Sequence, residues 1–296
     1  MSDQSTILSV DLDDVACYHA IHGLPAPAPE VAGAVLERCL PRFLELLDEL
    51  GSRATFFVVG RDLQRDLQAG GRGAAILRQA LAAGHELGNH SYAHAYDLVK
   101  WAPSAIYEDL RRCDTLLRGL GARPQGFRAP GYTHDVTLLQ QVGALGYRYD
   151  SSLLPSPSYY LAKLAAIGWT AVRGRTSQSL VRGWQSFLGP QRPHFMPGCG
   201  LWEVPVSVSP VLRLPMVGTF VLGAGGALLM REARERRYLH LELHGLDLAD
   251  ERGDGYDAAL RRVQPELRTP LTARLERLRG LITARGPTAS IGGVFV

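Results

Sequence analysis

Short apolar segments of β character alternate with segments of helical period along the first half of this chain, about every 30 to 40 residues. Strand character marks residues 6–10 and 54–60. The helical spacing of apolar residues marks 31–50, 74–83, 103–120 and 136–145. Repeated strand–helix units build a parallel sheet with helical crossovers, so the alternation predicts an α/β fold.

Residues 154–200 interrupt this alternation with a stretch rich in Pro, Ser, Gly and aromatic side chains. A long irregular insertion in a compact domain is usually a lid or a binding loop. Beyond it we expect strands at 201–206, 238–244 and 289–296, a helix at 271–284, and a buried strand and loop at 217–230. Since no internal repeat or linker is found, residues 1–296 are predicted to form a single domain.

The charged residues nearly balance, with 32 Lys and Arg against 29 Asp and Glu and a net charge of +3. No basic stripe is interleaved with aromatic residues, so composition does not support nucleic-acid binding. The uncharged run 214–230 is short and broken by Pro and Gly, which argues against a membrane span. Its apolar part, 217–230, makes a weak contact with a membrane surface a minor expectation.

The four cysteines are scattered, which predicts neither a disulfide framework nor a thiolate zinc site. Residues 1–5 lack the basic and apolar regions that begin a signal peptide. A reducing cytoplasm is therefore the expected location.

Acidic, basic and imidazole side chains follow the predicted strands at the points where those strands end. Because the carboxyl ends of parallel strands meet at one edge of a sheet or barrel, we expect these side chains to lie near one another. They are Asp11, Asp13 and Asp14 after the first strand, His90 and His94 after the third, and Arg128, Asp150, His244 and Asp247 later in the chain.

His90 and His94 stand four residues apart, and on a helical turn two such rings would face the same way. An isolated pair of this kind is more often two ordinary surface or core histidines. Two imidazoles with one carboxylate and open positions, however, are the ligand set of a catalytic Zn²⁺ site. Such an ion lowers the pKa of water and polarises an acyl oxygen, while a second carboxylate and a histidine can act as base and acid.

Five short motifs occur in the order found in the polysaccharide deacetylase (NodB-homology) superfamily. The chain resembles this superfamily from about residue 6 to residue 152, and more thinly thereafter. The motifs are SVDLDD at 9–14, ATFFV at 54–58, GHELGNHSYAH at 84–94, FRAPGY at 127–132 and DSS at 150–152. The resemblance implies a distorted (β/α)7-type barrel and a metal-dependent hydrolase that removes an acyl group from an amide nitrogen.

The resemblance also implies roles for individual residues. Asp13, His90 and His94 would bind one divalent metal ion, with Zn²⁺ expected first and Ni, Co or Fe as alternatives. Asp11 would be the general base, and His244 the general acid. The remaining family positions are Arg128, which would orient the base, and Pro130, Gly131 and Tyr132, whose loop would bring the Tyr132 backbone N–H to the oxyanion.

The aspartate motif departs from the common family pattern of two adjacent aspartates followed by Gly. Here Asp11-x-Asp13 is followed by Asp14 and Val15, so Asp13 as base with Asp14 as ligand is a competing register. The Asp-x-Asp form is similar to a variant branch that includes certain peptidoglycan deacetylases, imide hydrolases and lipid-linked sugar deformylases. Asp150 is expected to brace the site, and Asp247 either to tune His244 or to cap a loop.

We therefore expect hydrolysis of an N-acetyl or N-formyl group on a sugar or on a carrier-linked sugar. Hydrolysis of a cyclic amide or imide would need the same metal and base and is an alternative. A non-catalytic carbohydrate-binding barrel is the alternative of a different class.

Overall fold

The computed structural model describes residues 5–174, 176–178, 181 and 187–295 of the chain. These residues build one eight-stranded sheet with the strand order β6-β7-β5-β4-β3-β2-β1-β8. All neighbouring strands are parallel except β6 and β7, which are antiparallel. The strands are β1 Ser5–Asp11, β2 Thr55–Val58, β3 Glu86–Asn89, β4 Gly126–Phe127, β5 Tyr149–Asp150, β6 His194–Met196, β7 Leu201–Glu203 and β8 Tyr238–His244.

The sheet curls into a distorted barrel because the segment that follows β7 spans the distance to β8. The backbone N–H of Val204 donates to the carbonyl oxygen of Asp150 in β5 over 2.9 Å. Three residues later, the N–H of Ser207 donates to the carbonyl oxygen of His240 in β8 over 3.1 Å. The predicted α/β barrel is thereby confirmed, with its closure made by non-strand residues.

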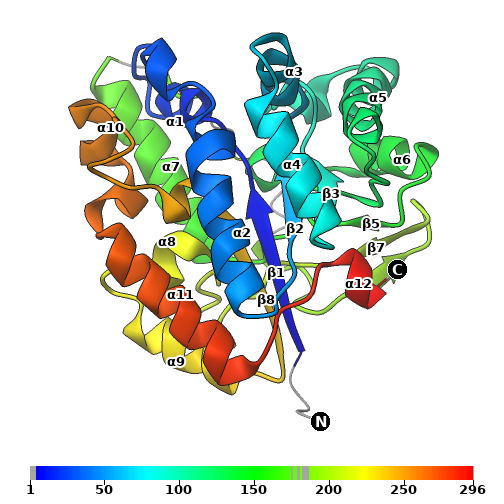
Figure 1. Ribbon diagram of the computed structural model, residues 1–296. Helices are drawn as coiled ribbons and strands as arrows, with labels where there is room; N and C mark the ends of the chain where they lie inside the picture. Colours follow the sequence, from blue (N-terminus) through cyan, green and yellow to red (C-terminus); the bar gives the residue numbers. More distant parts are fainter. Residues whose placement is uncertain (1–4, 175, 179–180, 182–186, 296) are drawn as a thin grey trace.

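Helices cover the outside of the sheet, and α2, α4 and α11 lie across the face that is nearest to the viewer in Figure 1. The main apolar core lies between these helices and the strands, where the rings of Phe43 and Phe56 meet edge to face. The helices are α1 Val15–Ile21, α2 Leu40–Glu49, α3 Gly60–Gln68, α4 Arg72–Ala82, α5 Pro103–Gly119, α6 Val136–Ala144, α7 Pro157–Val172, α8 Gly218–Val221, α9 Ala227–Glu235, α10 Ala258–Val263, α11 Leu271–Arg285 and α12 Gly292–Phe295.

Three sequence expectations differ from the structure. The run 217–230 is not a strand and loop, because it contains α8 and the start of α9. The predicted closing strand at 289–296 is reduced to one bridge between Ala289 and Ile7, after which α12 begins. Part of the predicted irregular insertion is the helix α7, whose start is stabilised by the side chain of Ser156, which accepts a hydrogen bond from the Tyr159 N–H.

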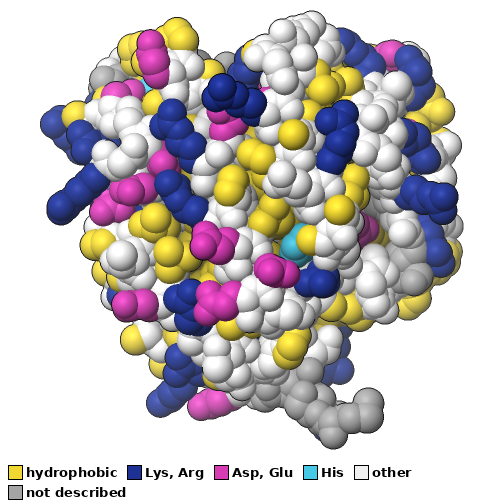
Figure 2. Space-filling model, in the orientation of Figure 1, with side chains coloured by type: hydrophobic (Ala, Val, Ile, Leu, Met, Phe, Trp, Pro, Cys, Tyr) yellow, Lys and Arg dark blue, Asp and Glu magenta, His cyan; other side chains and the backbone are white. Residues whose placement is uncertain are grey.

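The carboxyl ends of β1, β3, β4 and β8 meet at one end of the molecule. In the strand register, Asp11 lies beside His244 on one side and beside Phe57 on the other. This end is the upper one in Figure 1, between α1 and α3. The surface is notched there in Figure 2, and basic and acidic side chains are intermixed over the face shown.

Candidate active site

Asp13, His90 and His94 form a buried cluster at this end of the sheet. Oδ1 of Asp13 lies 3.1 Å from Nε2 of His90 and 3.1 Å from Nε2 of His94. One ligand atom from each of the three side chains lies within 4.8 Å of the other two. This donor set, two imidazoles and one carboxylate, is that of a catalytic divalent-metal site.

Unpartnered polar atoms support that interpretation. Oδ1 of Asp13 and both ring nitrogens of His94 are buried and make no hydrogen bond. Buried polar atoms without partners are rare in native proteins because their desolvation is not offset. A cation between Oδ1 of Asp13 and Nε2 of His94 would satisfy both of these atoms, so the residues present fit a metal ion.

The spacing of the two histidines suggests a helical turn, but both lie on a loop after β3. Ser91 and His94 have positive φ angles of 66° and 48°, which fold the loop tightly enough to bring both rings to Asp13. The carboxylate of Asp109 in α5 holds this conformation. It accepts hydrogen bonds from the hydroxyl of Ser91 (2.6 Å) and from the N–H groups of Tyr92 (2.9 Å) and Ala93 (2.8 Å).

The orientation of His90 is set from behind, because its Nδ1 lies 2.8 Å from the backbone carbonyl oxygen of Arg128. A carbonyl can only accept, so Nδ1 carries the proton and the lone pair of Nε2 points toward Asp13. Burial alone would raise the pKa of the Asp13 carboxyl, but the neighbouring imidazoles of His94 and His90 hold that pKa well below its usual value. Burial lowers the pKa of His94. An ionised carboxylate and a neutral imidazole are the forms that bind a metal.

Asp11 lies next to this cluster and is held by Arg128. Nη1 of Arg128 donates to Oδ1 of Asp11 over 2.7 Å, and Oδ2 of Asp11 lies 3.7 Å from Nε2 of His90. Arg128 is fully buried, and its other donors reach Ser9 Oγ, Ser151 Oγ and the Ser151 carbonyl oxygen. A carboxylate fixed in this way keeps one oxygen free to accept a proton.

His244 ends β8 and belongs to a second cluster with Asp11 and Glu242. Its Nδ1 lies 3.2 Å from Oε1 of Glu242. Burial would lower the pKa of His244, but the negative charges of Glu242, Asp11 and Asp13 outweigh it and raise that pKa to about 10. The imidazole is therefore protonated at neutral pH and can donate a proton.

Asp247 accepts a hydrogen bond from the backbone N–H of His244 over 2.8 Å and so caps the turn after β8. Asp150 is also away from the metal cluster. Its Oδ1 accepts from the hydroxyl of Ser152 over 2.7 Å, and Ser152 in turn accepts from the N–H of Ala129 (2.8 Å). Both aspartates thus brace loops at the edge of the site.

Asp14 points away from the metal cluster and pairs with Arg65 of α3. This contact leaves Asp13 as the aspartate that the structure brings to the two histidines. The backbone N–H of Tyr132 donates to the carbonyl oxygen of Ala129 over 3.0 Å, so it does not point free into the pocket as the oxyanion expectation requires.

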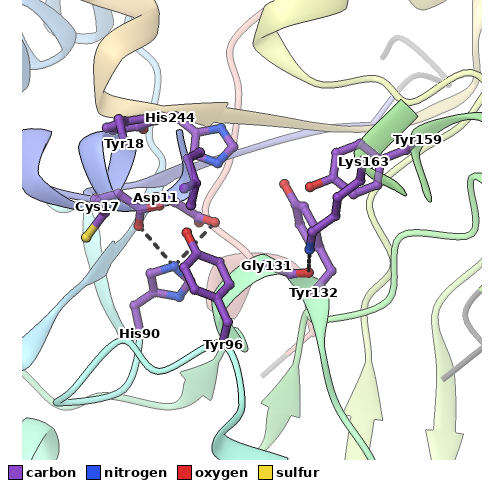
Figure 3. Close-up of a pocket in the computed structure, with 12 residues that line it drawn as sticks. Asp11, Cys17, Tyr18, His90, Tyr96, Gly131, Tyr132, Tyr159, Lys163 and His244 are labelled. Carbon is purple, nitrogen blue, oxygen red and sulfur yellow. Dashed lines mark hydrogen bonds and ion pairs between the residues drawn. The ribbon is translucent and has the colours of Figure 1, made fainter. Parts of the chain in front are cut away.

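A pocket of about 80 Å³ opens over the cluster. Figure 3 shows His90 and Tyr96 on one side of it, Tyr18 and His244 on the opposite side, and Lys163 with its neighbours on a third. Gly131 lines this third side, and Pro130 precedes it in the same turn. Gly131 has a φ of 59°, and a Cβ there would come within 2.7 Å of the Tyr96 ring, so the position requires glycine.

The sequence interpretation missed three residues of this site. Glu242 could have been found from the alternation in β8, since His240, Glu242 and His244 share one face of the strand. Lys163 reaches the pocket from α7, and its Nζ donates to the carbonyl oxygen of Gly131 over 3.1 Å. Asp109 lies in the middle of a helical pattern, and no local signal marks it.

Residues 32–149 match the sequence profile described as polysaccharide deacetylase. A chitin deacetylase from Colletotrichum lindemuthianum is 32% identical over 120 residues, which cover 40% of this chain and 47% of that protein. A peptidoglycan deacetylase-like protein from Gibberella zeae is 29% identical over 154 residues, covering 50% of this chain and 43% of that protein. The chain thus spans less than half the length of either relative.

Among solved structures, one assigned as a polysaccharide deacetylase from Mycobacterium smegmatis superposes with a TM-score of 0.57 at 20% identity. The match covers 95% of this chain and 83% of that one. The two proteins therefore share a fold over nearly the whole length described above.

Proposed function

We propose that this chain is a metal-dependent hydrolase that removes an acetyl or formyl group from the amide nitrogen of a sugar or carrier-linked sugar, since residues 32–149 match the sequence profile described as polysaccharide deacetylase. The observation that carries the proposal is the buried cluster of Asp13, His90 and His94 beside the Arg128-held carboxylate of Asp11.

Asp13, His90 and His94 would hold the metal ion, Zn²⁺ being the first expectation. When bound, such an ion supplies Lewis-acid polarisation of the acyl oxygen and acidifies water. Asp11 accepts the proton of the attacking water, because the hydrogen bond from Arg128 holds its carboxylate in place beside the cluster. His244, which lies beside Asp11 at the end of β8, donates a proton to the departing amine nitrogen, and Glu242 stabilises its protonated form.

The size of the pocket supports a small acyl group. A single water needs about 10 to 15 Å³ of such space, so a cavity of about 80 Å³ admits a group of a few heavy atoms. Of the two relatives named above, one is described as a chitin deacetylase and the other as a peptidoglycan deacetylase-like protein. Both descriptions refer to a polymer that contains an N-acetylated sugar. Four finer points are predictions from the sequence. They are the choice between an acetyl and a formyl group, the linkage of the sugar to a carrier, membership of the Asp-x-Asp variant branch, and a cytoplasmic location.

The direct test is an assay of acetate and formate release from N-acetyl and N-formyl sugars and chitooligosaccharides, with ring opening of cyclic imides measured in parallel. We expect amide hydrolysis that a chelator abolishes and Zn²⁺ restores. Turnover of the imides alone would favour the cyclic-amide alternative. Binding of metal and sugar with no hydrolysis would favour a non-catalytic barrel and contradict the proposal.

A further inference from the structure

Helix α7, Pro157–Val172, is apolar on nearly every side, although it lies at the surface. A helix that is hydrophobic all round is normally buried in a protein core or in lipid. Here Tyr160 is its only fully buried residue. On its outer face Leu161, Leu164 and Val172 are 63%, 48% and 79% exposed, and Trp169, 59% exposed, lies at the edge where this face meets the groove described next.

The inner face of α7 lines a groove of about 590 Å³ that adjoins the catalytic pocket. Lys163, Tyr159 and His244 line both spaces, so the two are continuous. The groove is lined mainly by apolar side chains, which come from α7 and from the α8 and α10 regions that face it. Among them are Ala166, Ile167, Val217, Phe220 and Val263, and the charged residues Arg173, Arg262, Arg268 and Glu266 also line the groove.

The charge of the surrounding sequence has one sign. The 52 residues from Ser151 to Trp202 contain no Asp or Glu and five Lys or Arg. Arg173 follows the last turn of α7, and its guanidinium lies 4.7 Å from the centre of the Trp169 ring. Exposed aliphatic side chains, an aromatic residue and flanking cations without anions are the composition of a helix that lies in the interface of an anionic bilayer.

We propose that the outer face of α7, formed by Leu161, Leu164, Trp169 and Val172, docks on the surface of an anionic lipid bilayer. The helix then lies in the plane of the interface, with the groove behind it and bordered at one edge by Trp169. A membrane-anchored N-acyl substrate would place its anchor in this groove and its acylamido group in the catalytic pocket. This last step rests on the proposed function, whereas the docking does not.

Docking on the surface of a bilayer does not require a helix that crosses the bilayer. Across the ranges that the structure covers, no helix is long and apolar enough to cross a membrane. Figure 1 shows α7 beside α1 and α10, toward the end of the molecule where the strands carry the site. A helix lying in the interface needs only the one apolar stripe that α7 presents.

The test is co-sedimentation of the full chain with vesicles of phosphatidylcholine, with or without phosphatidylglycerol. We expect binding to the anionic vesicles that weakens with added salt, because exposed charges are screened. The triple substitution Leu161→Ser, Leu164→Ser and Val172→Ser should lower the vesicle affinity at least tenfold. It should leave thermal unfolding and hydrolysis of a soluble N-acylated sugar unchanged.

A matched control replaces three exposed apolar residues elsewhere, Leu67→Ser, Val136→Ser and Leu228→Ser, and should bind vesicles as the wild type does. Absence of binding to anionic vesicles, or equal loss in the control, would overturn the proposal. So would a dimer in sedimentation velocity that the α7 substitutions dissociate, since a second copy would then cover the stripe. Vesicle binding needs no substrate, so failure of the docking proposal can be told apart from failure of the proposed function. An active enzyme that does not bind vesicles contradicts only the docking, and an inactive protein that binds them contradicts only the proposed function.

Discussion

Arg128 and Asp11 form a buried ion pair in which Nη1 donates to Oδ1 over 2.7 Å. The two residues are 117 positions apart in the chain, at the ends of β1 and β4. Through its backbone carbonyl the same arginine also orients His90. One residue thereby sets the geometry of the proposed base and of one metal ligand.

Asp11→Asn should separate these two functions. The amide keeps the shape of the side chain but cannot accept the proton of water, so we expect kcat to fall by about 10² to 10⁴-fold. Metal content, measured by mass spectrometry of the purified protein, should stay at the wild-type level because Asp13, His90 and His94 are intact. Turnover close to that of the wild type would remove Asp11 from the role of base.

Asp109→Asn should weaken metal binding although Asp109 is not a ligand. Its carboxylate holds the loop that carries His94 through three hydrogen bonds. Loss of such supporting contacts typically lowers metal affinity about 10- to 100-fold. Competition with a chelator measures this affinity. Glu108→Gln on the same helix, where the side chain is exposed and pairs with Arg111, is the control and should have no effect.

Glu242→Gln should lower the pKa of His244 in the metal-free protein. Burial opposes protonation of this imidazole, and the Glu242 charge is the strongest influence that favours it, giving a pKa of about 10. An NMR titration of the ring measures the change. His22, whose pKa is lowered by burial, serves as an internal control. An unchanged His244 pKa would show that Glu242 does not hold the proton in place.

The raised pKa of His244 predicts that the free energy of unfolding falls as the pH rises. The folded-state pKa of His244 exceeds the ordinary value of 6.5, so its protonation stabilises the fold. That contribution is complete below about pH 6.5 and is lost as the pH rises toward 10. The free energy of unfolding of the metal-free wild type should therefore fall more steeply over this interval than that of Glu242→Gln.

Gly126→Ala should destabilise the barrel. A Cβ at this position of β4 would overlap the ring of Tyr149 in β5, whose hydroxyl donates to Glu86 over 2.9 Å. Overpacking of a buried site costs about 1 to 3 kcal/mol, which urea denaturation can measure. Gly119→Ala, at the end of α5 with open space around it, is the control and should be neutral or slightly stabilising. Equal stabilities would contradict the packing argument.

Several strands and the strand-end positions of the site could be anticipated because they depend on local patterns. Apolar strands at β1 and β8 were visible in the sequence, and so was the convergence of Asp13 with the histidines once a parallel sheet was inferred. Long-range contacts could not be anticipated. The pairing of Asp14 with Arg65, which leaves Asp13 at the metal cluster, joins residues 51 positions apart.

Helix α7 lies within the predicted irregular insertion. The prediction is wrong there because Pro, Ser, Gly and Tyr, which are common in loops, are frequent in this segment. Ser156 and Pro157 are in fact a helix start, a side-chain cap followed by Pro in the first turn. Glu242 is absent from the predicted site, although it lies between His240 and His244 on the same face of β8. In both places the period of the side chains was the better guide than their chemical type.

The most direct test of this account is the metal content of four purified proteins after chelation and reloading with Zn²⁺. The account predicts about one ion per chain in the wild type and in Asp14→Asn, where the altered side chain faces Arg65. It predicts little or none in Asp13→Asn and in His94→Gln. An ion retained in Asp13→Asn and lost in Asp14→Asn would contradict it.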